Sequence, residues 1–376
     1  MDRFIGFWES LGYNGYLLLV CAGLFLFRLI NIIYCTVLVC RKEKSFSKNG
    51  KTGVSLIITA NNKAEELKEN LDYFLSQDYA PYEVIVVDEC SEDDTQDVLV
   101  EMQQKHPALR TTRIFPDTKF RSTKKLAINI GILAARYDIV LFAEINSRPL
   151  SGSWVKAMAS YFTPDTAVVL GYANYAAEKE KINFHRMYRF LRYLKMLLLV
   201  KGKSYVLGDG YNMAYRKSLY LTSKVFSRNS QSYAGYDNEI VRALSKAGKV
   251  KVAKNKNTFI EIKDSRKKTR SEDFTYYCFN RRRWELPVKL RANADNFLRM
   301  VFYILSFYLI NVKILQNYMI IGVLLTFLMD FVTLNIYLKH LKQKKLFLTS
   351  FIISSIGFLY RWYYNVNSIF TNKKWR

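Results

Sequence analysis

Apolar residues form long runs near both ends of the chain, whereas the middle alternates short apolar runs with charged segments. The first run covers residues 15–40, and Arg28 is the one charged residue inside it. Because roughly 20 apolar residues span a bilayer core of about 30 Å, this run predicts a transmembrane helix. Arg28 then needs a protein or headgroup partner, since a lone charge is costly in lipid. A cleaved signal peptide fits less well, because the run is long and no small-residue cleavage site follows a basic region.

The carboxyl-terminal third contains further apolar runs. Phe297–Gln316 and Tyr318–Leu338 predict two membrane spans that are joined by a tight turn near Asn317. Leu346–Tyr360 is shorter, so it can cross the membrane, re-enter it or lie at its surface. The sequence therefore predicts two or three membrane helices within residues 297–370.

Basic residues flank the predicted spans and indicate their orientation. Lysine or arginine occupies positions 41, 42, 44, 48 and 51, directly after the first run, and the basic loop Lys339–Lys345 follows a later one. Loops rich in these residues face the cytoplasm. We therefore expect the central part of an integral inner- or plasma-membrane protein to lie in the cytoplasm. The basic tail Lys373–Arg376 favours a cytoplasmic end as well.

The central part alternates apolar runs with amphipathic segments. Four runs predict strands: Val54–Thr59, Tyr82–Asp88, Thr112–Phe115 and Asp138–Ala143. Three segments with helical spacing lie between them: Glu65–Leu75, Thr95–Lys105 and Lys124–Arg136. Such alternation predicts a parallel sheet with right-handed crossovers. Because ligands of these sheets bind beyond the carboxyl ends of the strands, Asp88, Glu144 and Asn146 mark the candidate site.

Composition excludes several classes of protein. Half of the 376 residues are hydrophobic, including 27 Tyr and 25 Phe, so the chain can bury a core and is not disordered. Five cysteines, three of them in the first apolar run, do not make a disulfide framework. The three histidines lie far apart, and the sequence contains no zinc spacing, P-loop or Ser-His-Asp set.

The formal charge of +25 indicates an anionic partner. We expect anionic membrane lipid rather than nucleic acid, because membrane spans are predicted on both sides of the central part. Arg186, Arg189, Arg192 and Lys195 recur every three residues among apolar ones, as in a helix lying on anionic lipid or an ordinary solvated helix face. Residues 263–270 form a second basic stretch, which predicts a loop.

Several motifs occur in the order found in membrane-bound family-2 glycosyltransferases. The resemblance rests on the first strand, on residues 84–95, 124–131, 146–149 and 210–217, on Gly235-Tyr236-Asp237 and on Arg283-Trp284. It implies a GT-A-like (Rossmann-like) α/β domain over residues 50–290. A segment at 1–14 and a transmembrane helix at 15–40 would precede this domain, and membrane helices at 297–370 would follow it.

The resemblance assigns donor binding to Asp88, Glu89, Lys124, Glu144 and Asn146. Asp88 occupies the position of an Asp that binds the nucleobase, and Lys124 that of a Lys near the diphosphate. Glu144 and Asn146 stand where the family has Asp-x-Asp, so they are expected to hold Mg²⁺ or Mn²⁺ through oxygen ligands. Structural alternatives are a helix amino-terminal acid for Asp88, a solvated helix start for Lys124 and a solvated strand end for Glu144.

The remaining matches concern the acceptor side. Asp237 occupies the position of the family's catalytic base, and inverting transfer needs a carboxylate that takes the proton of the acceptor hydroxyl. A helix cap is the structural alternative for Asp237. Arg283 and Trp284 match an Arg-Trp pair that offers a phosphate-binding fork and a face for a sugar ring. Both would also suit an anchor at lipid headgroups.

Together these matches imply an inverting glycosyltransferase that moves a sugar from a nucleotide-sugar donor to a lipid-linked or envelope glycan acceptor. The sequence departs from the family pattern at Lys63, Glu89, Asn146, Tyr236 and Asn280. These changes support the alternative of a catalytically inactive glycosyltransferase-like membrane subunit or scaffold, which would act with a membrane protein partner. A lipid-surface adaptor would account for the charge but for none of the motifs.

Overall fold

The computed structural model describes residues 11–41, 52–115, 123–176, 182–205, 207–229, 236–263, 275–276, 280–281 and 283–370. The basic residues predicted at 42–51, the loop at 264–270, Gly235 and the tail at 373–376 lie outside the described residues. The chain divides into two compact units. The helical unit comprises residues 1–42, 179–187 and 281–371, and the sheet unit comprises residues 43–178, 188–280 and 372–376.

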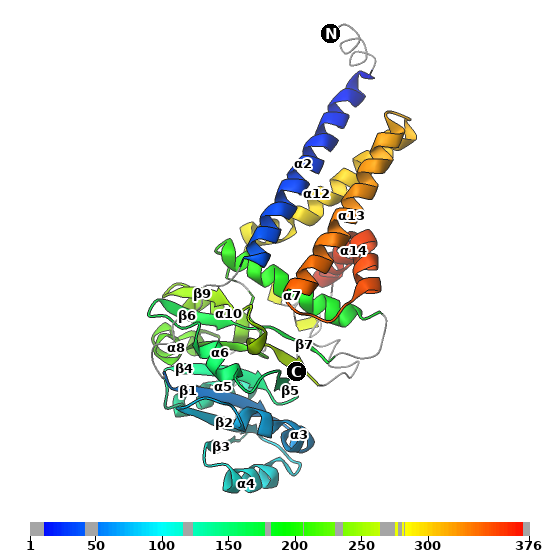
Figure 1. Cartoon of the computed structure of the whole chain (residues 1–376). Coiled ribbons are helices and arrows are strands. Elements are labelled where there is room, and N and C mark those ends of the chain that lie inside the picture. Colours follow the sequence, from blue (N-terminus) through cyan, green and yellow to red (C-terminus); the bar gives the residue numbers. More distant parts are fainter. Residues whose placement is uncertain are drawn as a thin grey trace. The chain divides into compact units, whose positions relative to one another are not determined.

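The sheet unit is built on a seven-stranded sheet with the strand order β3-β2-β1-β4-β8-β6-β9 (Figure 1). Its strands are β1 (Val54–Ala60), β2 (Tyr82–Glu89), β3 (Leu109–Ile114), β4 (Ile139–Glu144), β6 (Thr166–Leu170), β8 (Met213–Arg216) and β9 (Lys249–Val252). A second sheet has the order β5-β10-β7, with β5 (Ser147–Pro149), β7 (Ala173–Tyr175) and β10 (Ile260–Ile262). The two sheets contain all ten strands of the described residues.

Helices complete the sheet unit. They are α3 (Ala64–Leu75), α4 (Thr95–Lys105), α5 (Thr123–Ala134), α6 (Trp154–Ala159), α7 (Phe184–Lys201), α8 (Lys217–Ser223), α9 (Val225–Asn229) and α10 (Tyr236–Leu244), with a 3₁₀ turn at Lys256–Thr258. All seven residues of β1 are buried, as expected for a central strand that is covered on both faces. The core joins this strand to apolar residues of α3 and α6, including Leu71, Phe74 and Trp154.

The predicted α/β alternation is confirmed, and β1, β2, β3 and β4 are mutually parallel neighbours. The third strand was predicted too late, because it begins at Leu109 and ends at Ile114. The sequence did not predict the second half of this sheet. There β8 runs antiparallel to both β4 and β6, so the sheet is mixed. The pattern of apolar residues could not show this, because buried strands look alike in either direction.

The basic helix α7 does not present its arginines to lipid or to water. Arg186, Arg189 and Arg192 are each less than 9% exposed. Arg189 pairs with Asp209, and Arg192 donates a hydrogen bond of 2.9 Å to the carbonyl of Gly208. The prediction of a lipid-facing or solvated face was therefore wrong for these three arginines, because all are buried and two of them bond to acceptors inside the protein.

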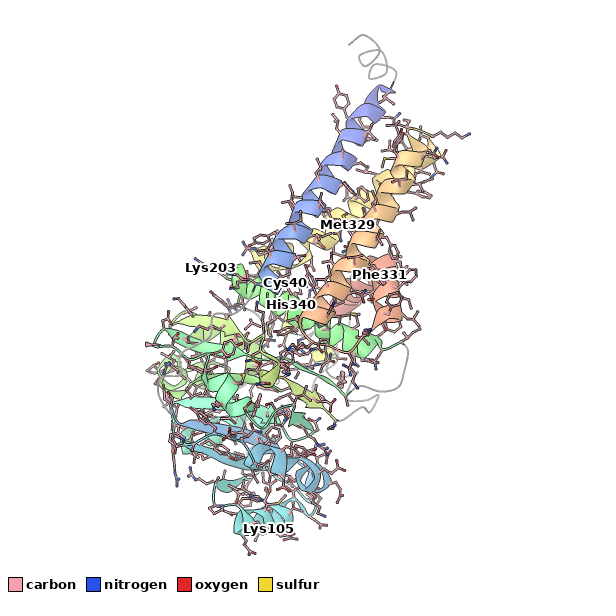
Figure 2. All side chains as sticks on the ribbon, viewed as in Figure 1. Cys40, Lys105, Lys203, Met329, Phe331 and His340 are labelled. Carbon is pink, nitrogen blue, oxygen red and sulfur yellow. The ribbon has the colours of Figure 1, made fainter. Side chains whose placement is uncertain are left out.

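The helical unit consists of α2 (Tyr13–Cys40), α12 (Leu286–Asn311), α13 (Gln316–His340) and α14 (Phe347–Phe370), as well as the start of α7. Among the described residues, α2 and α13 are long and apolar enough to cross a membrane. Figure 2 labels Cys40 and His340, the last residues of these two helices, at the same end, so α2 and α13 run in the same direction. The basic loop Lys339–Lys345 thus follows the end of α13 that lies beside the end of α2.

The bounds predicted for the carboxyl-terminal spans were partly wrong. α12 ends at Asn311 and α13 begins at Gln316, so the connection precedes Asn317 rather than surrounding it. Lys313 and Leu315 adopt left-handed backbone conformations there, which ends the first helix. The last helix reaches Phe370, well past the predicted end at Tyr360.

Arg28 has protein partners, as its place in an apolar helix requires. Its guanidinium pairs with Asp295 of α12 at 2.9 Å and with Asp330 of α13. Arg299 of α12 lies 3.0 Å from the other carboxylate oxygen of Asp330. Two arginines and two aspartates therefore balance each other among three helices, which makes burial of these charges tolerable.

Candidate active site

Four acidic or amide residues collect at the carboxyl edge of the parallel strands. In the sheet register Asp88 pairs with Ala60 at the end of β1, and Glu144 pairs with Thr59 on the other side of that strand. Glu89 is the last residue of β2, and Asn146 follows β4 by two residues. The structure thus brings together the residues that the sequence predicted for donor binding, at the edge where such sheets bind ligands.

Asp88 is 1% exposed, and its bonding is incomplete. Its Oδ1 accepts a hydrogen bond of 3.0 Å from the backbone N–H of Ser91. Its Oδ2 accepts no hydrogen bond in the described structure, although the Nε of Arg113 lies 3.4 Å away. A buried carboxylate oxygen without a donor is costly, so this atom is suited to receive an N–H from a ligand.

Lys124 lies in the first turn of α5 and joins two carboxylates. Its Nζ lies 2.5 Å from Oε1 of Glu144. Burial alone would lower the pKa of Lys124, but the charges of Glu144 and Glu89 outweigh it and raise the pKa above its ordinary value. Burial raises the pKa of Glu89, and Lys124 opposes that rise. The ammonium is therefore held in its charged form beside these two carboxylates.

Tyr236 lies next to this charged pair. The Nζ of Lys124 is 5.6 Å from the centroid of the Tyr236 ring, within reach of a cation–π interaction. A Cβ added at Gly210 would lie 2.7 Å from the Tyr236 hydroxyl, so the glycine leaves room for this side chain. The residue that replaces the family's Glu therefore fills the space between the lysine and the loop before β8.

The expected metal position has a limited set of ligands. Oδ1 of Asn146 is buried and accepts no hydrogen bond within the described ranges. Its Nδ2 donates a hydrogen bond of 3.3 Å to the hydroxyl of Tyr211. No group of three or more His, Cys, Asp or Glu that could hold a metal occurs among the described residues. Glu144 and Asn146 together fit a hard cation that takes its remaining ligands from phosphate and water, as Mg²⁺ often does.

Asp237 lies in the first turn of α10 rather than at its cap, and it is 2% exposed. Its Oδ1 accepts hydrogen bonds from the hydroxyl of Tyr276 at 2.5 Å and from the backbone N–H of Asn238 at 2.8 Å. Burial raises the pKa of Asp237, while Arg192 and Tyr276 counteract part of that rise. A raised pKa brings this carboxylate closer to the range useful for a general base.

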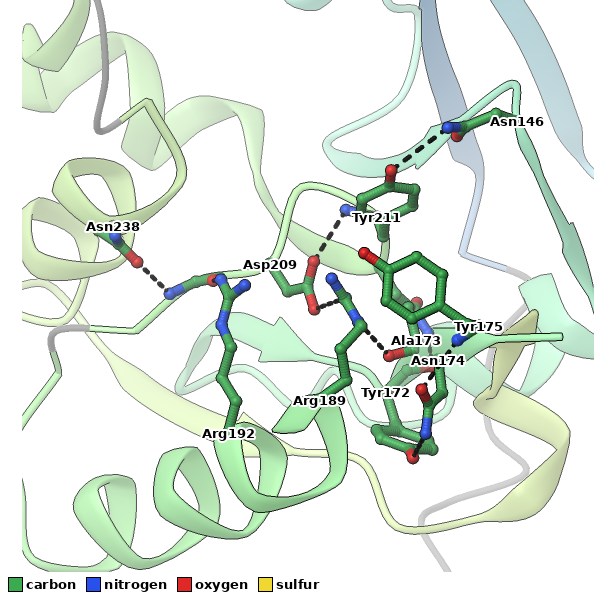
Figure 3. Close-up of polar contacts among 12 residues, drawn as sticks. Asn146, Tyr172, Ala173, Asn174, Tyr175, Arg189, Arg192, Asp209, Tyr211 and Asn238 are labelled. Carbon is green, nitrogen blue, oxygen red and sulfur yellow. Dashed lines mark hydrogen bonds and ion pairs between the residues drawn. The ribbon is translucent and has the colours of Figure 1, made fainter. Parts of the chain in front are cut away.

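A buried network, shown in Figure 3, connects Asn146 to helix α7. Tyr211 bonds to Asn146 through its side chain and donates its backbone N–H to Oδ1 of Asp209 at 3.2 Å. Asp209 Oδ2 pairs with Arg189, whose Nε donates to the carbonyl of Ala173 at 2.9 Å. The Arg189 guanidinium also lies 5.0 Å from the centroid of the Tyr211 ring. The network fixes the loop that precedes β8 against the site.

The same loop touches the start of α10. Arg192 donates to the carbonyl of Gly208, and the N–H of Gly208 donates to Oδ1 of Asn238 at 2.6 Å. A Cβ at Gly208 would lie 2.9 Å from the backbone of Asp237. Sequence reasoning missed Asp209, and the glycines on both sides of it were the available signal, because they permit this close approach.

Arg283 and Trp284 belong to the helical unit, whereas the residues above belong to the sheet unit. Trp284 is 6% exposed, and Arg283 is exposed. Their assignment to the acceptor side stays a prediction.

Residues 55–222 match the sequence model of the family described as glycosyl transferase family 2. The protein carries a family-2 glycosyltransferase domain. Two sequences of poly-beta-1,6-N-acetyl-D-glucosamine synthase from Staphylococcus epidermidis are similar to it. One, from strain RP62A, is 25% identical over 114 residues, and the other is 26% identical over 95 residues. These matches span 28% and 25% of this chain, and the chain spans only 26% and 22% of the respective relatives.

The fold of this chain also occurs in a solved structure. It is similar to the mannosyltransferase PcManGT from Pyrobaculum calidifontis, determined in complex with GDP-Man and Mn²⁺. The TM-score is 0.53 at 15% sequence identity, and the match covers 93% of this chain and 99% of the other. The comparison confirms the GT-A-like α/β fold class.

Proposed function

We propose that the protein is a membrane-anchored glycosyltransferase that moves a sugar from a nucleotide-sugar to a lipid-linked or envelope glycan acceptor, with inversion at the anomeric carbon. The observation that carries the proposal is the carboxyl edge of the sheet. There Asp88 offers a buried oxygen that accepts no hydrogen bond from the described residues, and Lys124 is held between Glu89 and Glu144. The family match and the polysaccharide synthase activity of the Staphylococcus relatives support transfer to a glycan.

Each residue of this edge has a role in donor binding. Asp88 would accept an N–H of the nucleobase, which disfavours bases that lack a donor at that position. Lys124 would neutralise charge on the diphosphate. Glu144 and Asn146 would hold Mg²⁺ or Mn²⁺, and the ion would supply further positive charge to the leaving diphosphate. Glu89 would keep Lys124 protonated and in place.

Asp237 would act on the acceptor. The acceptor hydroxyl oxygen forms a bond to the anomeric carbon on the face opposite the diphosphate, and the bond to the diphosphate oxygen breaks. Asp237 takes the hydroxyl proton as that bond forms, so the carboxylate becomes a carboxylic acid and the nucleoside diphosphate leaves with the bonding electrons. Arg283 and Trp284 would contribute to the acceptor side, for which a planar fork and an aromatic face are suited.

The helical unit would anchor the enzyme. α2 and α13 have the length and composition of membrane spans, and apolar side chains such as Leu26, Ile30 and Leu324 are exposed on them, as lipid-facing residues would be. Basic residues follow both helices, which supports a cytoplasmic catalytic domain at the inner or plasma membrane and contact with anionic lipid.

Donor binding by the full-length protein in detergent tests the proposal. UDP- and GDP-sugars would be titrated by calorimetry with and without Mn²⁺, using wild type, Asp88→Asn and the exposed control Asp94→Asn. We expect one class of donor to bind, and Asp88→Asn to weaken binding at least about tenfold while Asp94→Asn leaves it unchanged. Equal affinity of the wild type and Asp88→Asn for that donor would contradict the assignment.

A non-catalytic subunit is the second candidate function. Asn146 in place of a carboxylate favours it, because the amide brings less charge to a metal, and Lys124 already occupies an oxygen of Glu144. Folded protein that binds no donor of the panel, with or without Mn²⁺, would support this candidate over the enzyme.

A further inference from the structure

The catalytic carboxylate proposed above is bonded unequally at its two oxygens. Both hydrogen bonds that Asp237 accepts in the described structure go to Oδ1, one from the hydroxyl of Tyr276 and one from the N–H of Asn238. The hydroxyl bond, at 2.5 Å, is the shorter. Two donors on one oxygen fix the plane of the carboxylate and concentrate the remaining basicity on Oδ2.

Tyr276 is itself held in place. Its ring lies 6.0 Å, centroid to centroid, from that of Tyr236. Asn280, four residues later in the sequence, is 4% exposed, and its side chain interacts with the Tyr276 hydroxyl. Asn280 is the first residue of the Asn-x-x-Arg-Trp motif, so the hydroxyl that bonds to Asp237 also contacts this residue.

We propose that Tyr276 is a positioning residue for the catalytic base: its hydroxyl fixes Oδ1 of Asp237 and thereby directs Oδ2 toward the acceptor hydroxyl. The inference rests on the function proposed above. Nothing in the sequence motif marks Tyr276, because it lies between two motifs and contacts Asp237 only through the fold.

The groups around Asp237 determine how its pKa changes when the Tyr276 hydroxyl is removed. Arg192 of α7 faces the carboxylate and favours its ionised form, whereas Asp209 of the loop before β8 disfavours it. The Tyr276 hydroxyl also favours the ionised form, because a donated hydrogen bond stabilises the negative charge. Loss of the hydroxyl should therefore raise the pKa of Asp237, and the acid limb of the pH–rate profile should move to higher pH.

Tyr276→Phe tests the inference, because it removes the hydroxyl and keeps the ring. Release of nucleoside diphosphate from UDP- and GDP-sugars would be measured with full-length protein in detergent over pH 5–9. Tyr73→Phe serves as the matched control, because the Tyr73 side chain is exposed on α3. We expect kcat to fall about tenfold, the KM for the donor to change less than about twofold, and the acid limb to move up in pH. The control should match the wild type.

A second variant keeps the test independent of packing. Site-specific 3,5-difluorotyrosine at position 276 retains the ring and supplies a more acidic, stronger donor. The acid limb should then move to lower pH, opposite to its shift in Tyr276→Phe. This pair of opposite shifts would not follow from a merely structural role.

The outcomes separate the inference from the function on which it rests. An unchanged kcat and pH profile in Tyr276→Phe, with an active wild type, would overturn the inference alone. A rise in kcat would also overturn it, because the hydroxyl would then block the base rather than position it. Absence of turnover in the wild type with every donor would overturn both.

Discussion

The two ends of strand β2 carry buried carboxylates that are bonded in different ways. At the amino end, Glu83 accepts hydrogen bonds from the Ser55 hydroxyl at 2.7 Å, the Arg136 N–H at 2.7 Å and the Arg110 guanidinium at 2.8 Å. At the carboxyl end, Asp88 has one oxygen that accepts no hydrogen bond in the described structure. The complete bonding of Glu83 stabilises the fold, whereas the open oxygen of Asp88 is available to a ligand.

The amino end of strand β4 is preceded by a second acid with several hydrogen-bond donors. Asp138, just before it, accepts from Arg216 and from the N–H of Ser218, both at 2.9 Å, and these bonds lower its pKa despite burial. The pKa of Glu83 is lowered in the same way, against the effect of burial. At the carboxyl edge, burial instead raises the pKa of Glu89. Glu83 and Asp138 therefore differ from Glu89 in the direction of the pKa shift.

The largest effect on stability is expected at the amino edge. Glu83→Gln removes the charge that Arg110 and two further donors stabilise, so unfolding of the sheet unit should require about 3 kcal/mol less free energy. Asp88→Asn makes the same chemical change at the other end of the strand and should cost less than about 1 kcal/mol. Denaturant unfolding of both variants, followed by tyrosine and tryptophan fluorescence, measures the difference. Equal losses of unfolding free energy in the two variants would contradict the expected difference between the two ends of β2.

Lys124→Met should act on donor binding rather than on folding. It removes the positive charge between Glu89 and Glu144, so donor affinity should fall at least about tenfold, or roughly 1.4 kcal/mol. The exposed Lys156→Met serves as a control for the loss of one lysine. Calorimetric titration of the donor measures both affinities. An equal loss of affinity in Lys156→Met would contradict a specific role of Lys124 and would indicate a long-range charge effect.

The pH dependence of stability should differ between the two edges. The folded pKa of Glu83 lies below the unfolded value, so its contribution is present at neutral pH and is lost as the pH falls below about 4.5. The folded pKa of Glu89 lies above the unfolded value, so its ionisation reduces stability as the pH rises above that value. Melting temperatures from pH 3 to 8 should therefore flatten at the acid end in Glu83→Gln. Glu89→Gln should lie at or above the wild type at pH 7.

The smallest expected effect concerns the metal. Asn146→Asp restores a second carboxylate beside Glu144, and donor binding should then need about fivefold less Mn²⁺, close to 1 kcal/mol. Titration of Mn²⁺ at fixed donor, read by electron paramagnetic resonance of the free ion, checks this. If Asn146→Asp leaves the Mn²⁺ requirement unchanged, the ion does not bind at Asn146.

The sequence predicted the first half of the domain well. Val54–Thr59 and Thr95–Lys105 differ from the observed elements by at most one residue, because buried β-branched runs and amphipathic helices have distinct periods. The reversal of β8 and the burial of Arg189 were not predictable in the same way. A periodic pattern shows which residues share a face, but the fold decides whether that face meets lipid, water or an acid such as Asp209.

The candidate site also contains residues that the sequence could predict and one that it could not. Asp88 and Glu144 could be predicted, because strand ends can be located in a sequence and parallel ends meet at one edge. Tyr276 could not, because its hydrogen bond to Asp237 links residues 39 positions apart through a segment without a motif.

The most direct test of the account compares donor binding with turnover in Asp237→Asn. The account predicts donor affinity equal to that of the wild type, because Asp237 acts on the acceptor, and a fall in turnover of about 10²-fold or more, because the base is lost. The exposed Asp165→Asn should leave both unchanged. Wild-type turnover in Asp237→Asn, or a parallel loss of donor binding, would contradict the assignment of Asp237 as the base of a glycosyltransferase.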